Sequence, residues 1–383
     1  MRFILYFGSL CLVLAKVGQK KCKRFSSKDD DADDPSNNIP DFIKSPLPYT
    51  YTEIEVLPMG FDWRDVNGTS YVTADLNQHS PVYCGSCYLH GAISTLNDRL
   101  KIARKAQFPE INLARQVVLN CGQSVAGSCQ GGGDRGVYIF VHKSGLPDDT
   151  CQPYTALSSY ACSPYRNCMN CEPPTDEAPL GICYPVQSYN RYFVSEYGRM
   201  VNPSVHEMKS EIFHRGPISC SIDCASVTHG KYKPGDIVTT SLPASGEWDL
   251  DHVISVVGWG VDPEFGLEYW VVRNSWGTFW GDQGWFKVAL GNNTIGIESE
   301  CNWAVMDPNP VRANFGPSDT DREFASGSEP PSHGEIKFAK KFFGFVENPI
   351  EIVPPQPPAF ATNDLHKTLV DIRKPKLPET TEL

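Results

Sequence analysis

The chain has 383 residues, of which 40% are hydrophobic and 21% charged, as in a globular protein large enough for two domains. Its formal net charge of −11 argues against an electrostatic binder of nucleic acid. Prolines and glycines number 31 each, which indicates many turns and some sequence without regular structure.

The first residues indicate entry into the secretory pathway. Arg2 precedes an apolar run from Phe3 to Leu14, and Ala15 completes a small-residue cleavage pattern, so residues 1–15 are predicted to be a signal peptide. The run is too short for a membrane anchor, and no later stretch approaches the roughly 20 apolar residues of a spanning helix. Fourteen cysteines favour an oxidising compartment, either the lysosome or the extracellular space.

Two sequons for N-glycosylation agree with that compartment. They begin at Asn67 and Asn292, which are the candidate acceptors. Such triplets often arise by chance, so they add little weight alone.

Composition divides the rest of the chain into three parts. Residues 16–56 are polar and irregular, which predicts either a short pro-segment or a disordered tail. Residues 57–307 have a globular composition. Residues 308–383 contain twelve of the 31 prolines and no cysteine, so we expect a largely disordered, Pro-rich C-terminal extension.

Periodicity predicts helices first and strands later. Apolar residues recur at helical spacing from Tyr88 to Ala106, so a helix should begin at or just after Cys87. Shorter helices are expected near 112–119 and 203–213, and five cysteines predict a disulfide-stapled loop region over 151–183. Runs rich in β-branched and aromatic residues predict strands at 253–257 and 269–272. Together these indicate an α+β protein with two lobes.

One set of residues is typical of nucleophilic catalysis. Cys87 stands where a helix begins, so unsatisfied amides and a nearby imidazole could ionise its thiol. His252 opens a strand that could hold its ring against the sulfur, and Asn274 could orient that ring. The side-chain amide of Gln78 and the backbone amide of Cys87 could stabilise an oxyanion.

Cys84-Gly85-Ser86-Cys87 also contains a C-x-x-C pair, which could indicate a redox dithiol or half a zinc site. No second pair with zinc spacing lies near two histidines, so we expect no metal, and expect Cys84 to form a structural disulfide.

These motifs resemble the papain-like cysteine peptidases over about Leu57 to Asp307. The resemblance implies a helical N-terminal lobe, a sheet-rich C-terminal lobe and an active-site cleft between them. It also implies peptide hydrolysis without a cofactor. The stretches that carry it, besides the cysteine motif, are Phe61-Asp62-Trp63-Arg64, Val257-Gly258-Trp259-Gly260, Asn274-Ser275-Trp276-Gly277 and Trp280-Gly281-Asp282-Gln283-Gly284-Trp285.

An insertion points to one branch of this family. His79-Ser80-Pro81 follows Gln78 directly and resembles the His-Ile-Pro insertion of one branch of the family. The resemblance implies a carboxypeptidase that removes one C-terminal residue at a time. His79 would donate to the terminal carboxylate, which favours acidic pH. The alternatives are a surface histidine in a proline turn, and an endopeptidase whose cleft this loop does not close.

Three further positions keep two interpretations each. Gly131 and Gly132 could let a substrate backbone approach, or form an ordinary turn. Trp276 could wall the leaving-group side and shield the Asn274–His252 bond, or be a core tryptophan. Asp251 stands where that branch has Asn, and could raise the pKa of His252 or face solvent.

The resemblance also implies a disulfide framework. Cys224 has no counterpart in it and is left over, so it is expected either to be unpaired or to pair in place of Cys220. Cys22 is expected to bridge to Cys87 in the zymogen, which would keep the enzyme latent. The implied pairs are Cys84–Cys129, Cys121–Cys162, Cys151–Cys168, Cys171–Cys183 and Cys220–Cys301.

The expected partners are peptides or proteins with free C-termini, and protein inhibitors; nucleic acid is not expected, and the enzyme should be a monomer. The rival function is an inactive relative used for binding or adhesion. All four catalytic positions are filled, which argues against it.

Overall fold

The computed structural model describes residues 34–176, 181–228 and 230–314. The chain divides into two units, Met1–Ser328 and Glu329–Leu383, and all described residues belong to the first. The predicted signal peptide and residues 315–383 of the predicted extension lie outside the described residues.

Five α-helices and fourteen strands are found in the described residues. The helices are α1 (Cys87–Ala103), α2 (Arg115–Cys121), α3 (Gln123–Ala126), α4 (Asp134–Ser144) and α5 (Val205–Arg215). The strands are β1 (Phe61–Asp62), β2 (Gly127–Ser128), β3 (Gly131–Gly132), β4 (Met169–Glu172), β5 (Ile182–Pro185), β6 (Ser188–Arg191), β7 (Val194–Val201), β8 (Ile218–Ile222), β9 (Ile237–Val238), β10 (His252–Val261), β11 (Glu268–Arg273), β12 (Trp285–Ala289), β13 (Glu300–Met306) and β14 (Val311–Asn314).

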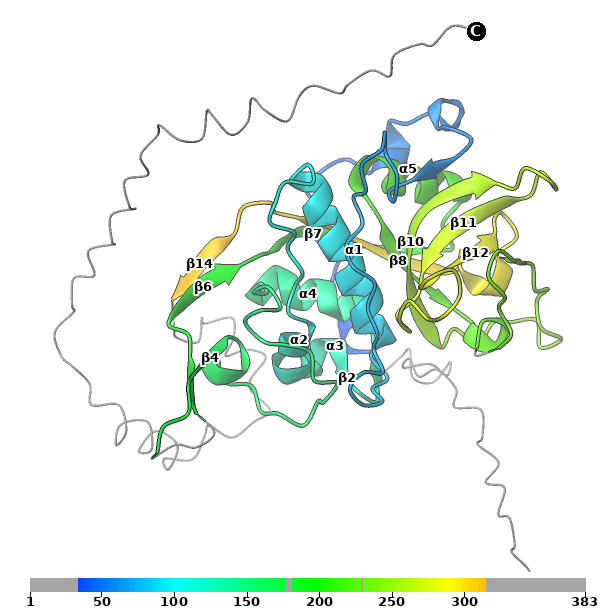
Figure 1. Ribbon diagram of the computed structural model, residues 1–383. Helices are drawn as coiled ribbons and strands as arrows, with labels where there is room; N and C mark the ends of the chain where they lie inside the picture. Colours follow the sequence, from blue (N-terminus) through cyan, green and yellow to red (C-terminus); the bar gives the residue numbers. More distant parts are fainter. Residues whose placement is uncertain (1–33, 177–180, 229, 315–383) are drawn as a thin grey trace, which may run out of the picture. The chain divides into compact units, whose positions relative to one another are not determined.

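The helical lobe is built around α1, whose residues from Cys87 to Leu100 are all buried. A helix buried all round must be covered on every side. Leu89, Ile93 and Leu96 share one apolar cluster with the inward faces of α2, α3 and α4. Figure 1 shows α1 between these helices and the sheet.

The second lobe is a sheet with the strand order β7-β13-β8-β10-β11-β12-β9, and β1 pairs with β10 beyond a bulge between Val256 and Gly258. Neighbouring strands are antiparallel except β12 and β9. Tryptophans fill its core: Trp259 and Trp270 are buried within it, as are Trp280 and Trp285. The two-lobed α+β arrangement predicted from the sequence is confirmed.

The lobes meet where α1 crosses β10. Gly91 makes this crossing close, because a Cβ there would lie 2.9 Å from Cγ1 of Val253 and 3.3 Å from the carbonyl oxygen of Ile254. Thr95 on α1 also hydrogen-bonds Ser255 on β10, with 3.1 Å between their hydroxyl oxygens. The element that begins with Cys87 is therefore fixed against the element that begins with His252.

Three regions differ from their predictions. Helix α4 was not predicted, because its β-branched and aromatic run Val137–Val141 lacks a clear helical period. The region 151–183 holds a short antiparallel pair, β4 with β5, in addition to loops. Strand β14 pairs with β6, so ordered sequence continues beyond residue 307.

Residues 34–56 pack on the body of the protein, which contradicts a disordered tail for this part of 16–56. They form three 3₁₀ turns: Pro35–Asn38, Pro48–Thr50 and Ile54–Val56. Arg135 on α4 holds the first stretch through Asp41, with Nη2 2.8 Å from Oδ1. Glu196 on β7 accepts the backbone amides of Lys44 and Ser45 at 2.8 and 3.0 Å.

The structure contains all five disulfides that the resemblance implied. Cys224 belongs to none of these five and is itself disulfide-bonded, so the prediction of an unpaired Cys224 is wrong. The cysteine count behind that prediction set aside the N-terminal cysteines. Cys22 lies outside the described residues, so its predicted bridge to Cys87 stays a prediction.

Candidate active site

Cys87 is the first residue of α1 and only 1% exposed. Its sulfur therefore lies at the end of a helix of 17 residues, where backbone amides lack intrahelical partners and the dipole favours a negative charge. The preceding residue, Ser86, is fixed by Tyr154, with 2.9 Å between the two hydroxyl oxygens.

His252 is the first residue of β10 and is fully buried. Its Nε2 lies 2.9 Å from Oδ1 of Asn274, and that oxygen also accepts the backbone amide of Ser275 at 2.8 Å. Its Nδ1 has no hydrogen-bond partner among the described residues. Burial lowers the pKa of His252 to about 4, with the Asn274 hydrogen bond opposing this and the charge of His79 adding to it.

Trp276 covers this pair. It is buried, and its ring centroid lies 5.0 Å from that of His252 with the planes 33° apart. Trp280 packs edge-on against it at 5.2 Å. Water is thereby excluded from one side of the imidazole, which strengthens the hydrogen bond to Asn274.

Gln78 is held at both ends of its side chain. Nε2 donates to the carbonyl oxygen of Cys84 at 3.1 Å, while Oε1 accepts from Oγ of Ser275 at 2.7 Å. Its backbone amide donates to the carbonyl of Ser275 at 2.8 Å, and its carbonyl accepts from Tyr154 at 2.9 Å. A side-chain amide fixed in this way is suited to donate its second hydrogen to an oxyanion.

The His79 ring stacks on Tyr83, with centroids 4.6 Å apart and planes within 7°. Its backbone amide donates to Oδ1 of Asn77 at 3.0 Å. The charge of His79 lowers the pKa of His252, and after burial the charge of Cys87 is the next cause that raises the pKa of Tyr83. His79 therefore interacts electrostatically with His252, and its stacking partner Tyr83 interacts with Cys87.

Gly131 and Gly132 form β3, which pairs with β2. A Cβ on Gly132 would lie 2.0 Å from the carbonyl oxygen of Ala126 and 2.7 Å from the Tyr88 ring. Only glycine fits here, so the residue is required by the packing of the loop whether or not substrate also binds there.

Asp251 differs from the expectation that it could face solvent. It is buried, and its Oδ1 accepts the backbone amide of Cys224 at 2.9 Å. Burial raises the pKa of Asp251 to about 7, with Asp223 and Asp249 adding to the rise. The buried Asp251 carboxyl therefore directly precedes His252 in the chain and holds the backbone of Cys224.

Reasoning from the sequence missed Ser275, Tyr154 and Tyr83. Ser275 stands inside the Asn274–Gly277 motif, so a search for partners of Gln78 could have found it. No sequence signal indicates Tyr154, because only the fold brings it to Gln78. Asn67 and Asn292, the predicted glycosylation sites, are both exposed.

Within the described ranges, no group of three or more His, Cys, Asp or Glu residues could hold a metal ion. Among those same residues, no helix has the length and hydropathy needed to cross a bilayer.

Residues 57–305 match the model of the papain family cysteine proteases, and the chain belongs to this family. It is 40% identical over 255 residues to cathepsin Z of Onchocerca volvulus, covering 65% of this chain and 78% of that protein. It is 29% identical over 267 residues to cathepsin B-like cysteine proteinase 3 of Caenorhabditis elegans, covering 67% and 66%.

Solved structures share the fold. One from a study of the mite allergens Blo t 1 and Der p 1 has a TM-score of 0.53 at 25% identity, covering 69% of this chain and 75% of that one. The proCathepsin B S9 of Trypanosoma congolense has a TM-score of 0.52 at 20% identity, covering 70% and 83%. The match to the papain family and the 40% identity to cathepsin Z confirm the resemblance seen in the sequence.

Proposed function

We propose that this peptidase is a carboxypeptidase that removes single residues from the C-termini of peptides. The observation that carries the proposal is the stacked His79–Tyr83 pair, whose two members interact electrostatically with His252 and Cys87. A cationic donor at this position would bind the terminal carboxylate, and its loop would exclude longer chains. The similarity to cathepsin Z supports the same mode.

The reaction begins with proton transfer from Cys87 to His252. Burial keeps an isolated His252 ring neutral, so the imidazolium exists only when the adjacent sulfur is a thiolate. The thiolate attacks the last peptide carbonyl carbon, forming a C–S bond. The oxyanion is held by Nε2 of Gln78 and the backbone amide of Cys87.

Collapse of this intermediate breaks the C–N bond. The imidazolium gives its proton to the leaving amine, and the C-terminal amino acid departs. A water molecule then attacks the thioester while neutral His252 takes its proton. The shortened peptide leaves as a carboxylic acid, and the Cys87–His252 pair is restored.

We further propose that residues 16–56 are a pro-segment and 57–307 the peptidase domain. The docking of 34–56 through Arg135 and Glu196 supports this assignment. The disulfides and the cathepsin relatives support a location in the secretory pathway, lysosomal or extracellular.

The test is hydrolysis of paired peptides with free and amidated C-termini, followed by mass spectrometry. We expect one residue to be lost from the free acid and little reaction with the amide. Equal cleavage of both, or cleavage at internal bonds, would show an endopeptidase instead.

A further inference from the structure

We propose that Arg273 is a positioning residue for catalysis: it fixes, through one guanidinium, the three chain segments that carry Cys87, Gln78 and Asn274. The inference rests on the proposed catalytic roles of these three residues.

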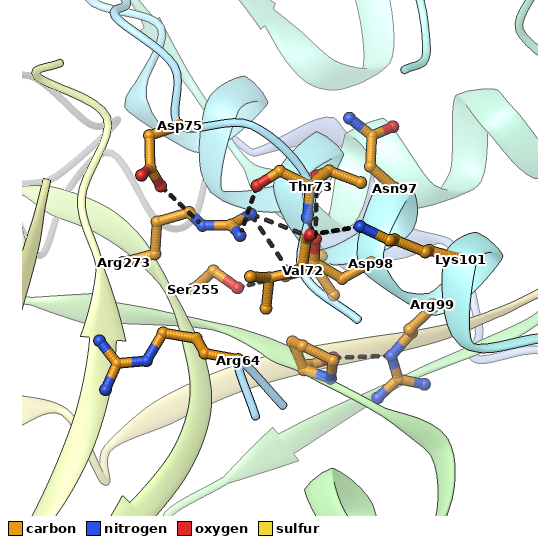
Figure 2. A network of polar contacts seen from close by, with 12 residues as sticks. Arg64, Val72, Thr73, Asp75, Asn97, Asp98, Arg99, Lys101, Ser255 and Arg273 are labelled. Carbon is orange, nitrogen blue, oxygen red and sulfur yellow. Dashed lines mark hydrogen bonds and ion pairs between the residues drawn. The ribbon is translucent and has the colours of Figure 1, made fainter. Parts of the chain in front are cut away.

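The Arg273 side chain is 1% exposed and reaches three polar partners (Figure 2). Nη1 lies 3.2 Å from Oδ2 of Asp98, and Nη2 donates to the carbonyl oxygen of Thr73 at 3.0 Å. Nε lies 3.2 Å from Oδ1 of Asp75. The guanidinium also stacks over the Trp285 ring, 4.6 Å from its centroid. A planar fork bound on so many sides has one orientation.

Each polar partner belongs to a segment with a proposed catalytic residue. Asp98 lies on α1, the helix that begins with Cys87. Thr73 and Asp75 lie just before Gln78, whose amide donates to the carbonyl of Ser275. Arg273 itself ends β11 and is followed directly by Asn274.

The carboxylate of Asp98 closes the network. Oδ1 accepts the backbone amide of Thr73 at 2.7 Å and its hydroxyl at 2.9 Å. Burial raises the pKa of Asp98, and the charge of Arg273 opposes that rise. The helix and the segment leading to Gln78 are thereby joined directly as well as through Arg273.

The strand that carries His252 is also tied to this network. Ser255 faces Arg273 in the register of β10 and β11, and its hydroxyl bonds Thr95 on α1. A shift of Arg273 would therefore change the position of Asn274 relative to both Cys87 and His252.

Buried ion pairs are poor evidence of stability, because well-packed apolar residues often do as well. A second such pair on the same helix provides the comparison. Arg99 lies 2.9 Å from Glu211, with side chains 2% and 3% exposed. That pair joins α1 to α5, and α5 carries no residue of the proposed site.

The experiment compares Asp98→Asn with Glu211→Gln in the full chain after maturation. Each change removes one charge from a buried pair and keeps the shape. Urea unfolding, kcat and KM as functions of pH, and the rate of Cys87 alkylation as a function of pH would be measured for both.

We expect both variants to lose stability but only Asp98→Asn to lose kcat, by about 10-fold, with KM nearly unchanged. Displaced Asn274 would no longer stabilise the imidazolium. The alkaline limb of kcat/KM should therefore move down by about one pH unit, and the pH at which Cys87 alkylation sets in should move up by about as much. Arg273→Lys should recover part of the activity that Arg273→Met loses.

Equal kcat and equal pH profiles in Asp98→Asn and Glu211→Gln would overturn the proposal and leave the network a purely structural one. The proposed carboxypeptidase mode fails on a different result, equal cleavage of free and amidated peptides by the unmodified enzyme. Should Arg273→Met not fold, the two isosteric variants still decide the matter.

Discussion

Nε2 of His252 lies 2.9 Å from Oδ1 of Asn274, and that same oxygen accepts the amide of Ser275 at 2.8 Å. An amide oxygen can only accept, so Nε2 must carry a proton. Nδ1 is then the nitrogen that would exchange a proton with Cys87 in the proposed mechanism. The tautomer that the proposed mechanism needs is thus set by the residue that follows Arg273.

Asn274→Ala removes the acceptor from the imidazolium. A hydrogen bond to a charged group contributes about 1.5–3 kcal/mol, so kcat/KM should fall about 10- to 100-fold. The alkaline limb of the pH–rate profile should also move to lower pH. Asn302→Ala, which removes another buried asparagine of the sheet, is the control and should leave the profile in place.

Gln78→Ala removes the side-chain donor of the proposed oxyanion hole. The expected loss in kcat is about 10²- to 10³-fold, with little change in KM. In the unmodified protein, Oε1 of Gln78 accepts from the Ser275 hydroxyl at 2.7 Å. Ser275→Ala removes this hydrogen bond but keeps the Nε2 donor of Gln78. Its loss should be smaller; the reverse order would rule out the role given to Nε2.

His79→Ala tests the carboxylate donor. Hydrolysis of free-acid peptides should fall about 10- to 100-fold, the range for a charge-assisted hydrogen bond, while slow cleavage of amidated peptides stays unchanged. Tyr83→Leu removes the ring that stacks on His79 and should give a smaller loss of the same kind. Tyr83→Phe keeps the ring and should behave like the parent enzyme.

Gly91→Ala tests the close crossing of α1 and β10. The added Cβ would lie 2.9 Å from Cγ1 of Val253, so the helix must move or the core must strain, at a cost of about 1–3 kcal/mol. Denaturant unfolding and kcat should both fall. Adding Val253→Ala removes the clashing atom and should recover part of the lost kcat; no recovery would argue against steric displacement.

The contact of Glu196 with residues 34–56 should be sensitive to acid. Burial raises the pKa of Glu196. Hydrogen bonds from the Ser45 hydroxyl and from the backbone amides of Lys44 and Ser45 lower it, as does the charge of Arg215. These effects outweigh burial, so the pKa of Glu196 lies below its usual 4.5. A depressed folded pKa contributes stability above pH 4.5 that is lost as pH falls through the folded value. Docking should therefore weaken below about pH 4.5.

Hydrogen exchange of residues 34–56, corrected for intrinsic rates and measured in the inactive Cys87→Ala chain, would follow this release. Protection should fall below pH 4.5 in that chain. With Glu196→Gln added, protection should already be low at pH 6 and change less with acid. Protection that is independent of pH in both chains would refute the role of Glu196.

The elements with strong periodicity could be predicted from the sequence, and α1 begins at the residue expected. Helix α4 could not, because a run such as Val137–Val141 favours a strand until the packing around α1 imposes a helix. Its burial in the core of the helical lobe outweighs local propensity.

The residues of the candidate site also differ in whether the sequence could predict them. The residues Gln78, Cys87, His252 and Asn274 could be identified from motifs, since their chemistry is local to short stretches. The supports of these residues could not, because only the fold brings Tyr154 to Gln78 and Asp98 to Arg273. The bonding of Cys224 also escaped prediction, since counting cysteines does not give their connectivity.

The most direct measurement of the central claim is labelling of the matured protein with an epoxide thiol reagent, with the modified residue identified by mass spectrometry. We expect one label per chain, on Cys87, with loss of peptide hydrolysis in proportion to labelling and neither label nor activity in Cys87→Ala. Hydrolysis that persists in Cys87→Ala, or a fully active enzyme after complete labelling, would contradict it.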